Sequence, residues 1–182
     1  MRQYISQIQK LSIYIIAALL LFSCSSDDNG NNPEPGNNVE LNEMSLDVSG
    51  SVVGPRSGKS VITTSNGKGY NTFEIDGSDG PDATFEINFY TYNGGNDPVP
   101  WPEKGTYSLN SDADYTNGKG FRVSFEDVVE WRDYSKNVIG TLTITDNSNQ
   151  SLKGTFEFSA DEHGGTGSIS VTNGVFYASM EE

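Results

Sequence analysis

The chain has 182 residues with 25 acidic and 11 basic side chains, and its formal net charge at pH 7 is −14. This balance argues against binding to nucleic acid, which requires a basic face, and against electrostatic docking on anionic lipid headgroups. Cys24 is the only cysteine, so no disulfide forms within the chain and packing must hold the fold.

The first 23 residues are typical of a lipoprotein signal peptide. An apolar run from Leu11 to Phe22 follows two basic residues. The run has the length of a signal-peptide core and is shorter than the roughly 20 residues that a membrane-spanning helix needs. Leu21-Phe22-Ser23-Cys24 closes it in the manner of a lipobox, where the signal is cut and the new terminal cysteine is acylated. We therefore expect Cys24 to anchor the mature protein in a membrane.

Residues 24–38 predict a flexible tether, because they are rich in Asn, Gly, Pro and Asp and contain no large apolar side chain. Removal of residues 1–23 also removes Arg2 and Lys10. Nine basic residues then remain against 25 acidic ones, a net charge of −16. The remaining residues, 39–182, are enough for a single folded domain with its own core.

Beyond residue 38 the hydrophobic periodicity is two, which indicates strands with one buried and one solvated face. Phe85, Ile87 and Phe89, for example, alternate with polar residues. The same alternation occurs at 121–126, 141–145 and 152–159. Weaker strand candidates are 44–53, 60–64, 70–76, 105–109, 128–133 and 168–178.

Turn residues separate these segments, and no segment after Cys24 has helical periodicity. The pattern predicts an all-β fold, either a single antiparallel β-sandwich or a flattened β-barrel of about nine or ten short strands. Asn173-Gly174 lies between apolar residues. It is either a bulge within one long final strand or a tight turn between two short strands.

Four segments carry a family resemblance: GTYSL (105–109), GTLTI (140–144), GTFEFSA (154–160) and ISVTNGVF (169–176). Together they resemble small Bacteroidota lipoproteins with a C-terminal all-β domain of unknown function and the pattern "GTFxFxA … VTNGxF". The resemblance implies an all-β secreted lipoprotein and supplies no catalytic residues. In that group, acidic residues just after the lipidated cysteine resemble a surface-export signal, and Ser25-Ser26-Asp27-Asp28 is similar. The resemblance thus implies an outer-membrane location facing the cell exterior.

His163 is the only histidine. As a general base it would need a nearby serine and acid, and no GxSxG motif accompanies it. We expect it to lie in the loop that joins the last strands, with no catalytic role.

Two acid-rich loops are candidate calcium sites, because Ca²⁺ takes roughly six to eight oxygen ligands. Neither loop has the EF-hand spacing, and solvated turns are the alternative interpretation. The candidate ligands are Asp76, Asp79, Asp82, Asp112 and Asp114. We expect no other cofactor.

Aromatic side chains give the main functional indication. Tyr90 and Tyr92 lie on the polar phase of their strand, and Trp101 lies in the proline-bracketed segment 98–102. Rings on a rigid β-scaffold can stack on sugars or anchor a protein partner. Alternatively, the same rings cover an edge or a second sheet of the fold.

The sequence therefore predicts a membrane-anchored, surface-exposed lipoprotein with a non-catalytic β-domain that binds a glycan or another envelope protein. One alternative is a glycan-acting hydrolase whose carboxylates assemble only in three dimensions. Another is a barrel that carries an apolar ligand inside, which a solid core of Phe85, Phe121 and Phe156 would exclude.

Overall fold

A computed structural model describes residues 39–66, 71–93, 98–111 and 120–181. The predicted signal peptide, Cys24 and the predicted tether lie outside these residues. Among the described residues, no helix is long and apolar enough to cross a membrane. The described ranges form nine strands: β1 (Glu43–Gly50), β2 (Gly54–Asn66), β3 (Asn71–Ser78), β4 (Phe85–Asn93), β5 (Gly105–Asn110), β6 (Gly120–Asp127), β7 (Arg132–Asp146), β8 (Ser151–Glu162) and β9 (Ser168–Met180).

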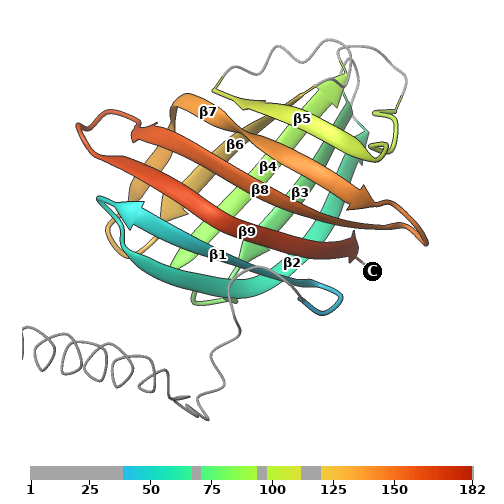
Figure 1. The fold of residues 1–182 in the computed structure, drawn as a ribbon, viewed down its shortest axis with the longest axis horizontal. Helices are drawn as coiled ribbons and strands as arrows, with labels where there is room; N and C mark the ends of the chain where they lie inside the picture. Colours follow the sequence, from blue (N-terminus) through green and yellow to red (C-terminus); the bar gives the residue numbers. More distant parts are fainter. Residues whose placement is uncertain (1–38, 67–70, 94–97, 112–119, 182) are drawn as a thin grey trace, which may run out of the picture. The chain divides into compact units, whose positions relative to one another are not determined.

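The strands close into one barrel (Figure 1). Around it the order is β1-β2-β3-β4-β6-β5-β7-β8-β9, and β9 pairs with β1 to complete the circle. Neighbouring strands are antiparallel except for β5 with β6 and a short stretch of β2 with β9, which are parallel. The prediction of an all-β fold is confirmed. Of the two predicted architectures the barrel forms, and its sheet is mixed rather than purely antiparallel.

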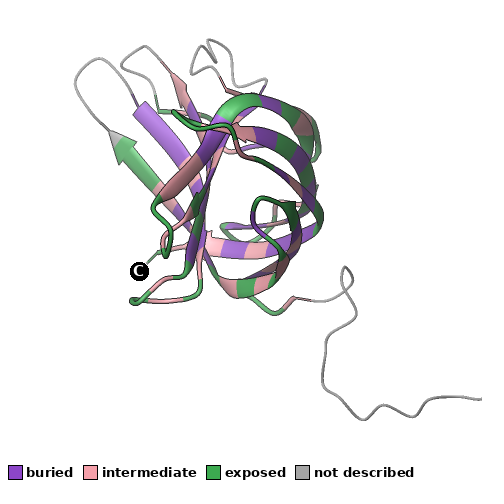
Figure 2. Cartoon of the chain, turned by 90° about the vertical axis from the view of Figure 1, so that its left-hand side faces the viewer, coloured by how far each residue is buried: buried purple, intermediate pink, exposed green. Residues whose placement is uncertain are grey.

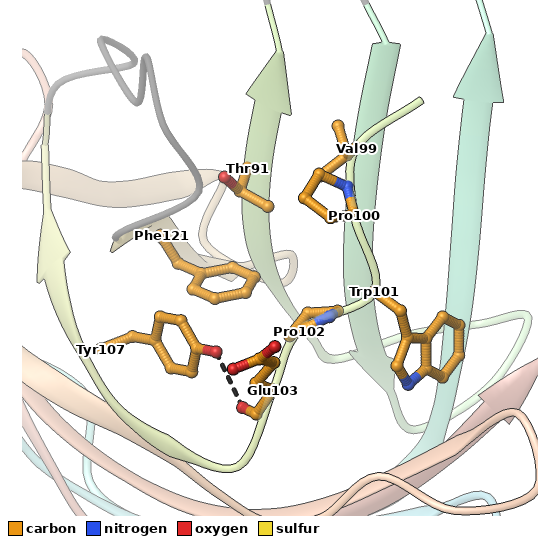
Figure 3. A pocket seen from close by; sticks show the side chains of 8 residues that line it. All are labelled: Thr91, Val99, Pro100, Trp101, Pro102, Glu103, Tyr107 and Phe121. Carbon is orange, nitrogen blue, oxygen red and sulfur yellow. Dashed lines mark hydrogen bonds between the residues drawn. The ribbon is translucent and has the colours of Figure 1, made fainter. Parts of the chain in front are cut away.

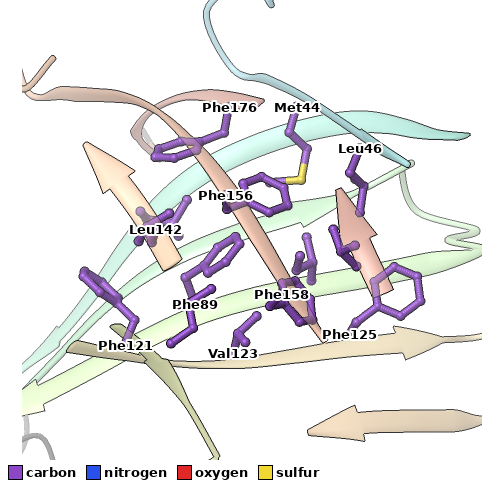
Figure 4. Packing of buried hydrophobic residues seen from close by; sticks show 14 of the residues in the cluster. Met44, Leu46, Phe89, Phe121, Val123, Phe125, Leu142, Phe156, Phe158 and Phe176 are labelled. Atoms are coloured by element: carbon purple, nitrogen blue, oxygen red, sulfur yellow. The ribbon is translucent and has the colours of Figure 1, made fainter. Parts of the chain in front are cut away.

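The barrel interior is filled by the apolar phase of each strand, as the alternating burial in Figure 2 shows. Rings from opposite walls meet inside: Phe89 on β4 and Phe156 on β8 have centroids 4.8 Å apart (Figure 4). Phe85 and Phe121 are also buried in this core. Such close packing does not favour a carrier that holds an apolar ligand in the middle of the barrel.

Two reciprocal glycine–phenylalanine pairs join β8 to β9. Gly154 faces Phe176, and Gly174 faces Phe156. A Cβ on Gly154 would lie 2.7 Å from the Phe176 ring, and one on Gly174 would lie 2.4 Å from the Phe156 ring. Each glycine thus provides the space for the ring opposite, and the motifs at 154–160 and 169–176 serve packing.

β9 is one continuous strand with a bulge, which confirms the first of the two predictions for Asn173-Gly174. Phe156 pairs with Gly174 but Phe158 pairs with Val171, so β9 has an additional residue between these positions. Asn173 has a φ of 52°, in the left-handed region that Asn tolerates. Its side-chain Nδ2 donates a hydrogen bond to Oδ2 of Asp47 on β1, at 3.0 Å.

The weak strand predicted over 128–133 is wrong. Asp127 and Arg132 pair directly, and residues 128–131 form the turn between β6 and β7. Val129 and Trp131 in this turn are 63% and 87% exposed. Their apolar character suggested a buried strand, whereas the pairing of β6 with β7 leaves both at the tip of a hairpin.

Candidate functional site

A pocket of about 230 Å³ lies at the end of the barrel where β4 ends and β5 begins, which we call the pocket end (Figure 3). Of the residues between these strands the structure describes 98–104, and we call them the covering segment. Three lining residues come from strands: Thr91 from β4, Tyr107 from β5 and Phe121 from β6. The others come from the covering segment: Val99, Pro100, Trp101, Pro102 and Glu103.

The position of β5 explains why space remains at this end. β6 and β7 pair directly only near their shared turn, from Phe125↔Tyr134 to Asp127↔Arg132. Towards the pocket end they diverge, and β5 pairs with β6 on one side and with β7 on the other. An additional strand increases the diameter of a barrel. Interior side chains therefore have a wider gap to fill here than at the opposite end.

Several contacts fix the covering segment over the barrel. The Trp101 ring packs edge-on against Phe73, with centroids 5.3 Å apart and an interplanar angle of 88°. The Tyr107 hydroxyl donates to the Glu103 carbonyl at 2.7 Å, and Asn147 Nδ2 donates to the Pro102 carbonyl at 3.2 Å. Because the prolines also restrict the backbone dihedrals, the segment forms a stiff wall of the pocket.

Tyr107 forms another wall. Its ring meets Phe121 edge-on, with centroids 5.4 Å apart. Burial raises the pKa of the Tyr107 hydroxyl, and the Glu103 carboxylate raises it further, while the hydrogen bond to the Glu103 carbonyl acts in the opposite direction. The hydroxyl therefore stays protonated at neutral pH and remains the donor in that bond. Figure 3 shows the Glu103 carboxylate beside it.

Thr91 is the most informative residue of the pocket. It follows Phe85, Ile87 and Phe89 on the inward phase of β4 and is only 2% exposed. Its Oγ1 atom is buried and has no hydrogen-bond partner in the described structure. A buried hydroxyl is normally satisfied, because leaving it unpaired costs about 1–3 kcal/mol. Thr91 therefore has an unused hydrogen-bonding group beside the pocket, which a rotation of its side chain about χ1 would turn towards a ligand.

The charge of the pocket is negative. Glu103 is the one ionisable carboxylate among the described lining residues, and no Lys, Arg or His is among them. Lys104, the next residue in the chain, is engaged elsewhere: its Nζ lies 2.8 Å from Oδ1 of Asp146. The hydrogen bond from Lys104 holds the pKa of Asp146 below its usual value, with a further contribution from Ser148.

The structure separates the three predicted aromatic residues. Trp101 lines the pocket and is partly buried, whereas Tyr90 and Tyr92 lie on the outer face of β4. The two tyrosine rings are neighbours, with centroids 6.2 Å apart. Trp101 thus belongs to the covering segment that lines the pocket, with its ring packed against Phe73, and the tyrosine pair forms a separate surface feature.

Sequence reasoning missed Thr91 and Tyr107. The sequence did indicate Thr91, because it is the next residue on the inward-facing side of the strand after Phe85, Ile87 and Phe89, and it is polar. A polar side chain on a buried phase indicates either an internal hydrogen bond or a ligand site. Tyr107 carried no comparable signal, because its contact with the covering segment depends on the placement of β5.

His163 lies exposed in the turn between β8 and β9, so its predicted location is confirmed. Its backbone N–H donates to the Asp133 carbonyl at 2.7 Å. No pocket-lining residue is near it in the chain, and the imidazole is not part of the site described above.

The calcium candidates are largely engaged in structural hydrogen bonds. Asp76 accepts hydrogen bonds from Thr63 and Asn88 on neighbouring strands. Asp79 accepts from the backbone and the hydroxyl of Thr84, which shapes the β3–β4 turn. Within the described ranges no three His, Cys, Asp or Glu side chains gather as a metal site would require. Of the remaining candidates, Asp82 is exposed in the β3–β4 turn, and Asp112 and Asp114 lie outside the described residues.

Partial burial acts to raise the pKa of Asp79, but hydrogen bonds from Thr84 and Phe85 outweigh it, so this pKa lies below its usual value. The carboxylate is therefore ionised at neutral pH. Its function in the described structure is to hold the β3–β4 turn.

The described structure is thus a closed, mixed, nine-stranded β-barrel with an aromatic-lined pocket at one end. The chain belongs to the family described as Domain of unknown function (DUF6252), whose model matches residues 63–179. The matched range includes every described residue of the pocket lining. Comparison with curated proteins and with solved structures gives no match.

Proposed function

We propose that the chain is the precursor of a lipid-anchored, non-catalytic binding protein whose barrel takes one sugar ring of a glycan in the end pocket. The observation that carries this proposal is the buried, unpartnered hydroxyl of Thr91 in a pocket that also contains Trp101 and Tyr107. A hydroxyl or amine of the ligand would satisfy Thr91. The aromatic rings would pack against the apolar face of the sugar.

The size of the pocket supports one ring rather than a large ligand. An apolar cavity of about 150 Å³ holds a single benzene ring, and sites for drug-sized molecules occupy roughly 300–1,000 Å³. At about 230 Å³ the pocket lies between these sizes. A six-membered ring with its substituents is therefore the unit that it accommodates best.

A binding role is favoured over hydrolysis. Glycoside hydrolysis generally needs two carboxylates on either side of the scissile bond. The described lining of the pocket contains one, Glu103, on its exposed rim. An envelope protein that inserts one side chain remains the alternative ligand, because Trp and Tyr also anchor protein partners.

The predicted lipobox supports anchoring through acylated Cys24. The net charge of −16 after signal cleavage implies that lipid, rather than basic residues, provides the attachment. By the resemblance to Bacteroidota lipoproteins, Ser25-Ser26-Asp27-Asp28 supports export to the outer membrane with the barrel facing the cell exterior.

Ligand binding is tested by retention of the full-length chain on immobilised polysaccharides. Trp101→Ala should reduce retention at least tenfold, since it removes the ring whose contact with Phe73 holds the covering segment in place as a wall of the pocket. Trp131→Ala is the matched control, because Trp131 is 87% exposed in the β6–β7 turn and does not line the pocket. Equal retention of both variants on every polysaccharide would contradict the proposal.

Location is tested by adding protease to intact cells, with Cys24→Ala as the control for lipidation. We expect the anchored protein to be degraded from outside and the Cys24→Ala variant to be released from the membrane fraction. Protection until the outer membrane is broken would place the barrel in the periplasm. The ligand would then be sought among periplasmic components.

A further inference from the structure

We propose that the sugar unit in the end pocket carries a protonated amine, so that the ligand is a glycan with free amino sugars. This inference rests on the proposed function, because it specifies the chemistry of the ring that the pocket would take.

The described lining of the pocket is rich in acceptors and contains no cation. Glu103 contributes a carboxylate, and Thr91 Oγ1 is free to accept or donate. The Tyr107 hydroxyl already donates to the Glu103 carbonyl, so its oxygen is left as an acceptor. Pro100 and Pro102 contribute no backbone N–H. A complementary ligand must therefore bring donors, and an ammonium group brings three.

Among the described residues, the basic side chains next to the lining residues in the chain do not face the pocket. Lys104 pairs with Asp146. Arg122 follows the inward-facing Phe121 on β6, so strand alternation places its side chain on the outer face of the sheet. An anionic sugar would meet the Glu103 carboxylate with no basic partner in the described lining, and desolvating it there would be unfavourable.

Two further features favour a cation. The rings of Tyr107 and Phe121 line the pocket, and the faces of aromatic rings attract ammonium groups. The net charge of −16 expected for the mature chain gives the protein a negative potential, which raises the local concentration of cationic ligands. A neutral sugar gains from neither effect.

The test is calorimetric titration of the full-length chain in detergent with glucosamine, N-acetylglucosamine and glucose at neutral pH. Glucosamine should bind about tenfold more tightly than the two neutral sugars, because it adds a charge-assisted hydrogen bond. Glu103→Gln should abolish this preference while weak binding of the neutral sugars persists. Glu157→Gln, which removes an exposed carboxylate on β8, is the control for net charge and should retain it.

The other outcomes separate this inference from the proposed function. If all three sugars bind equally and Trp101→Ala abolishes binding, the amine is not recognised, although the pocket still binds sugar. If none binds, both proposals fail. If a lysine-containing peptide binds through Glu103 while glucosamine does not, the amino-sugar proposal is overturned in favour of a protein partner.

Discussion

At the scale of single residues, Thr91 and Thr72 form a natural comparison. Both are buried and both hydroxyls lack a described partner, but Thr91 lines the pocket and Thr72 does not. Replacing either with Val removes an unsatisfied hydroxyl and should raise the free energy of unfolding by about 1 kcal/mol. Thr91→Val should also weaken sugar binding about tenfold, whereas Thr72→Val should leave it unchanged.

Denaturant unfolding and calorimetric titration of the two variants measure these effects. A Thr91→Val variant that gains stability and keeps full affinity would show that the hydroxyl has no part in binding. Equal losses of affinity in both variants would instead indicate a general effect on the sheet.

The reciprocal pairs of β8 and β9 give a second prediction at this scale. A Cβ on Gly154 would lie 2.2 Å from the backbone oxygen of Thr143, and no flexible side chain can absorb that contact. We expect Gly154→Ala to lower the free energy of unfolding by about 1–3 kcal/mol, the range of overpacked cores.

Gly165→Ala is the matched control for Gly154→Ala. Its new Cβ would meet the flexible end of the Glu162 side chain, which can move away by giving up its hydrogen bond from the Gly167 N–H, so we expect a smaller loss of stability than for Gly154→Ala. The measurement is the thermal unfolding midpoint of each variant, which should be lower for Gly154→Ala. Equal midpoints would show that the β8–β9 pairing accommodates the new methyl group without loss of stability.

At the scale of elements, the covering segment depends on its attachment to the β7–β8 turn. Asn147→Ala removes the hydrogen bond to the Pro102 carbonyl, so we expect faster amide hydrogen exchange over 98–104 and several-fold weaker sugar binding. Lys104→Ala removes an ion pair whose side chains are 57% and 39% exposed, and pairs so exposed to solvent contribute little to stability. It should therefore change exchange and affinity little. Larger effects from Lys104→Ala than from Asn147→Ala would contradict this assignment.

The strands themselves were largely predictable, because local alternation sets which side chains face a core. Phe85, Ile87 and Phe89 are buried as their spacing predicts. Closure of the barrel was not predictable, since it depends on pairings between residues far apart in the chain. β5 illustrates this: its sequence indicates a strand, but nothing local places it between β6 and β7.

The candidate site was predicted only in part for the same reason. The prolines around Trp101 indicated a stiff segment that displays a ring, but the ring is partly buried against the core rather than displayed. It packs on Phe73, a contact between separate elements that no local pattern encodes. Tyr90 and Tyr92 were grouped with Trp101 because all three are aromatic, yet strand alternation places the tyrosines on the outer face.

At the scale of the whole molecule, the excess of acidic groups predicts how stability depends on pH. Glu126 lies between Glu86 and Asp133 across the strand pairings of β4, β6 and β7. Partial desolvation raises its pKa above the ordinary value of 4.5, and the carboxylates of Asp133 and Glu86 raise it further. The folded state therefore binds this proton more tightly than the unfolded state does.

The stabilisation from Glu126 is fully present below pH 4.5 and is lost as the pH rises through the higher pKa of the folded state. Asp79 and Asp146 have lowered pKa values, so their contributions are present above pH 3.8 and are lost on further acidification. We expect the melting temperature to rise from pH 7 to about 4.5 and to fall below about 3.8. Relief of charge repulsion near the isoelectric point of about 4.3 acts in the same direction as Glu126.

Circular-dichroism melts across this pH range separate the two causes. Glu86, Glu126 and Asp133 form a row of paired carboxylates across β4, β6 and β7. Glu126→Gln removes the middle one, so it should flatten the rise in melting temperature between pH 7 and 4.5. Glu157→Gln changes the net charge equally at an exposed position that pairs with Thr141 rather than with another carboxylate, so it should keep the full pH dependence of the melting temperature. If the melting temperatures of the two variants depend on pH in the same way, general charge repulsion accounts for the rise in melting temperature. The row Glu86–Glu126–Asp133 would then have no specific influence on stability.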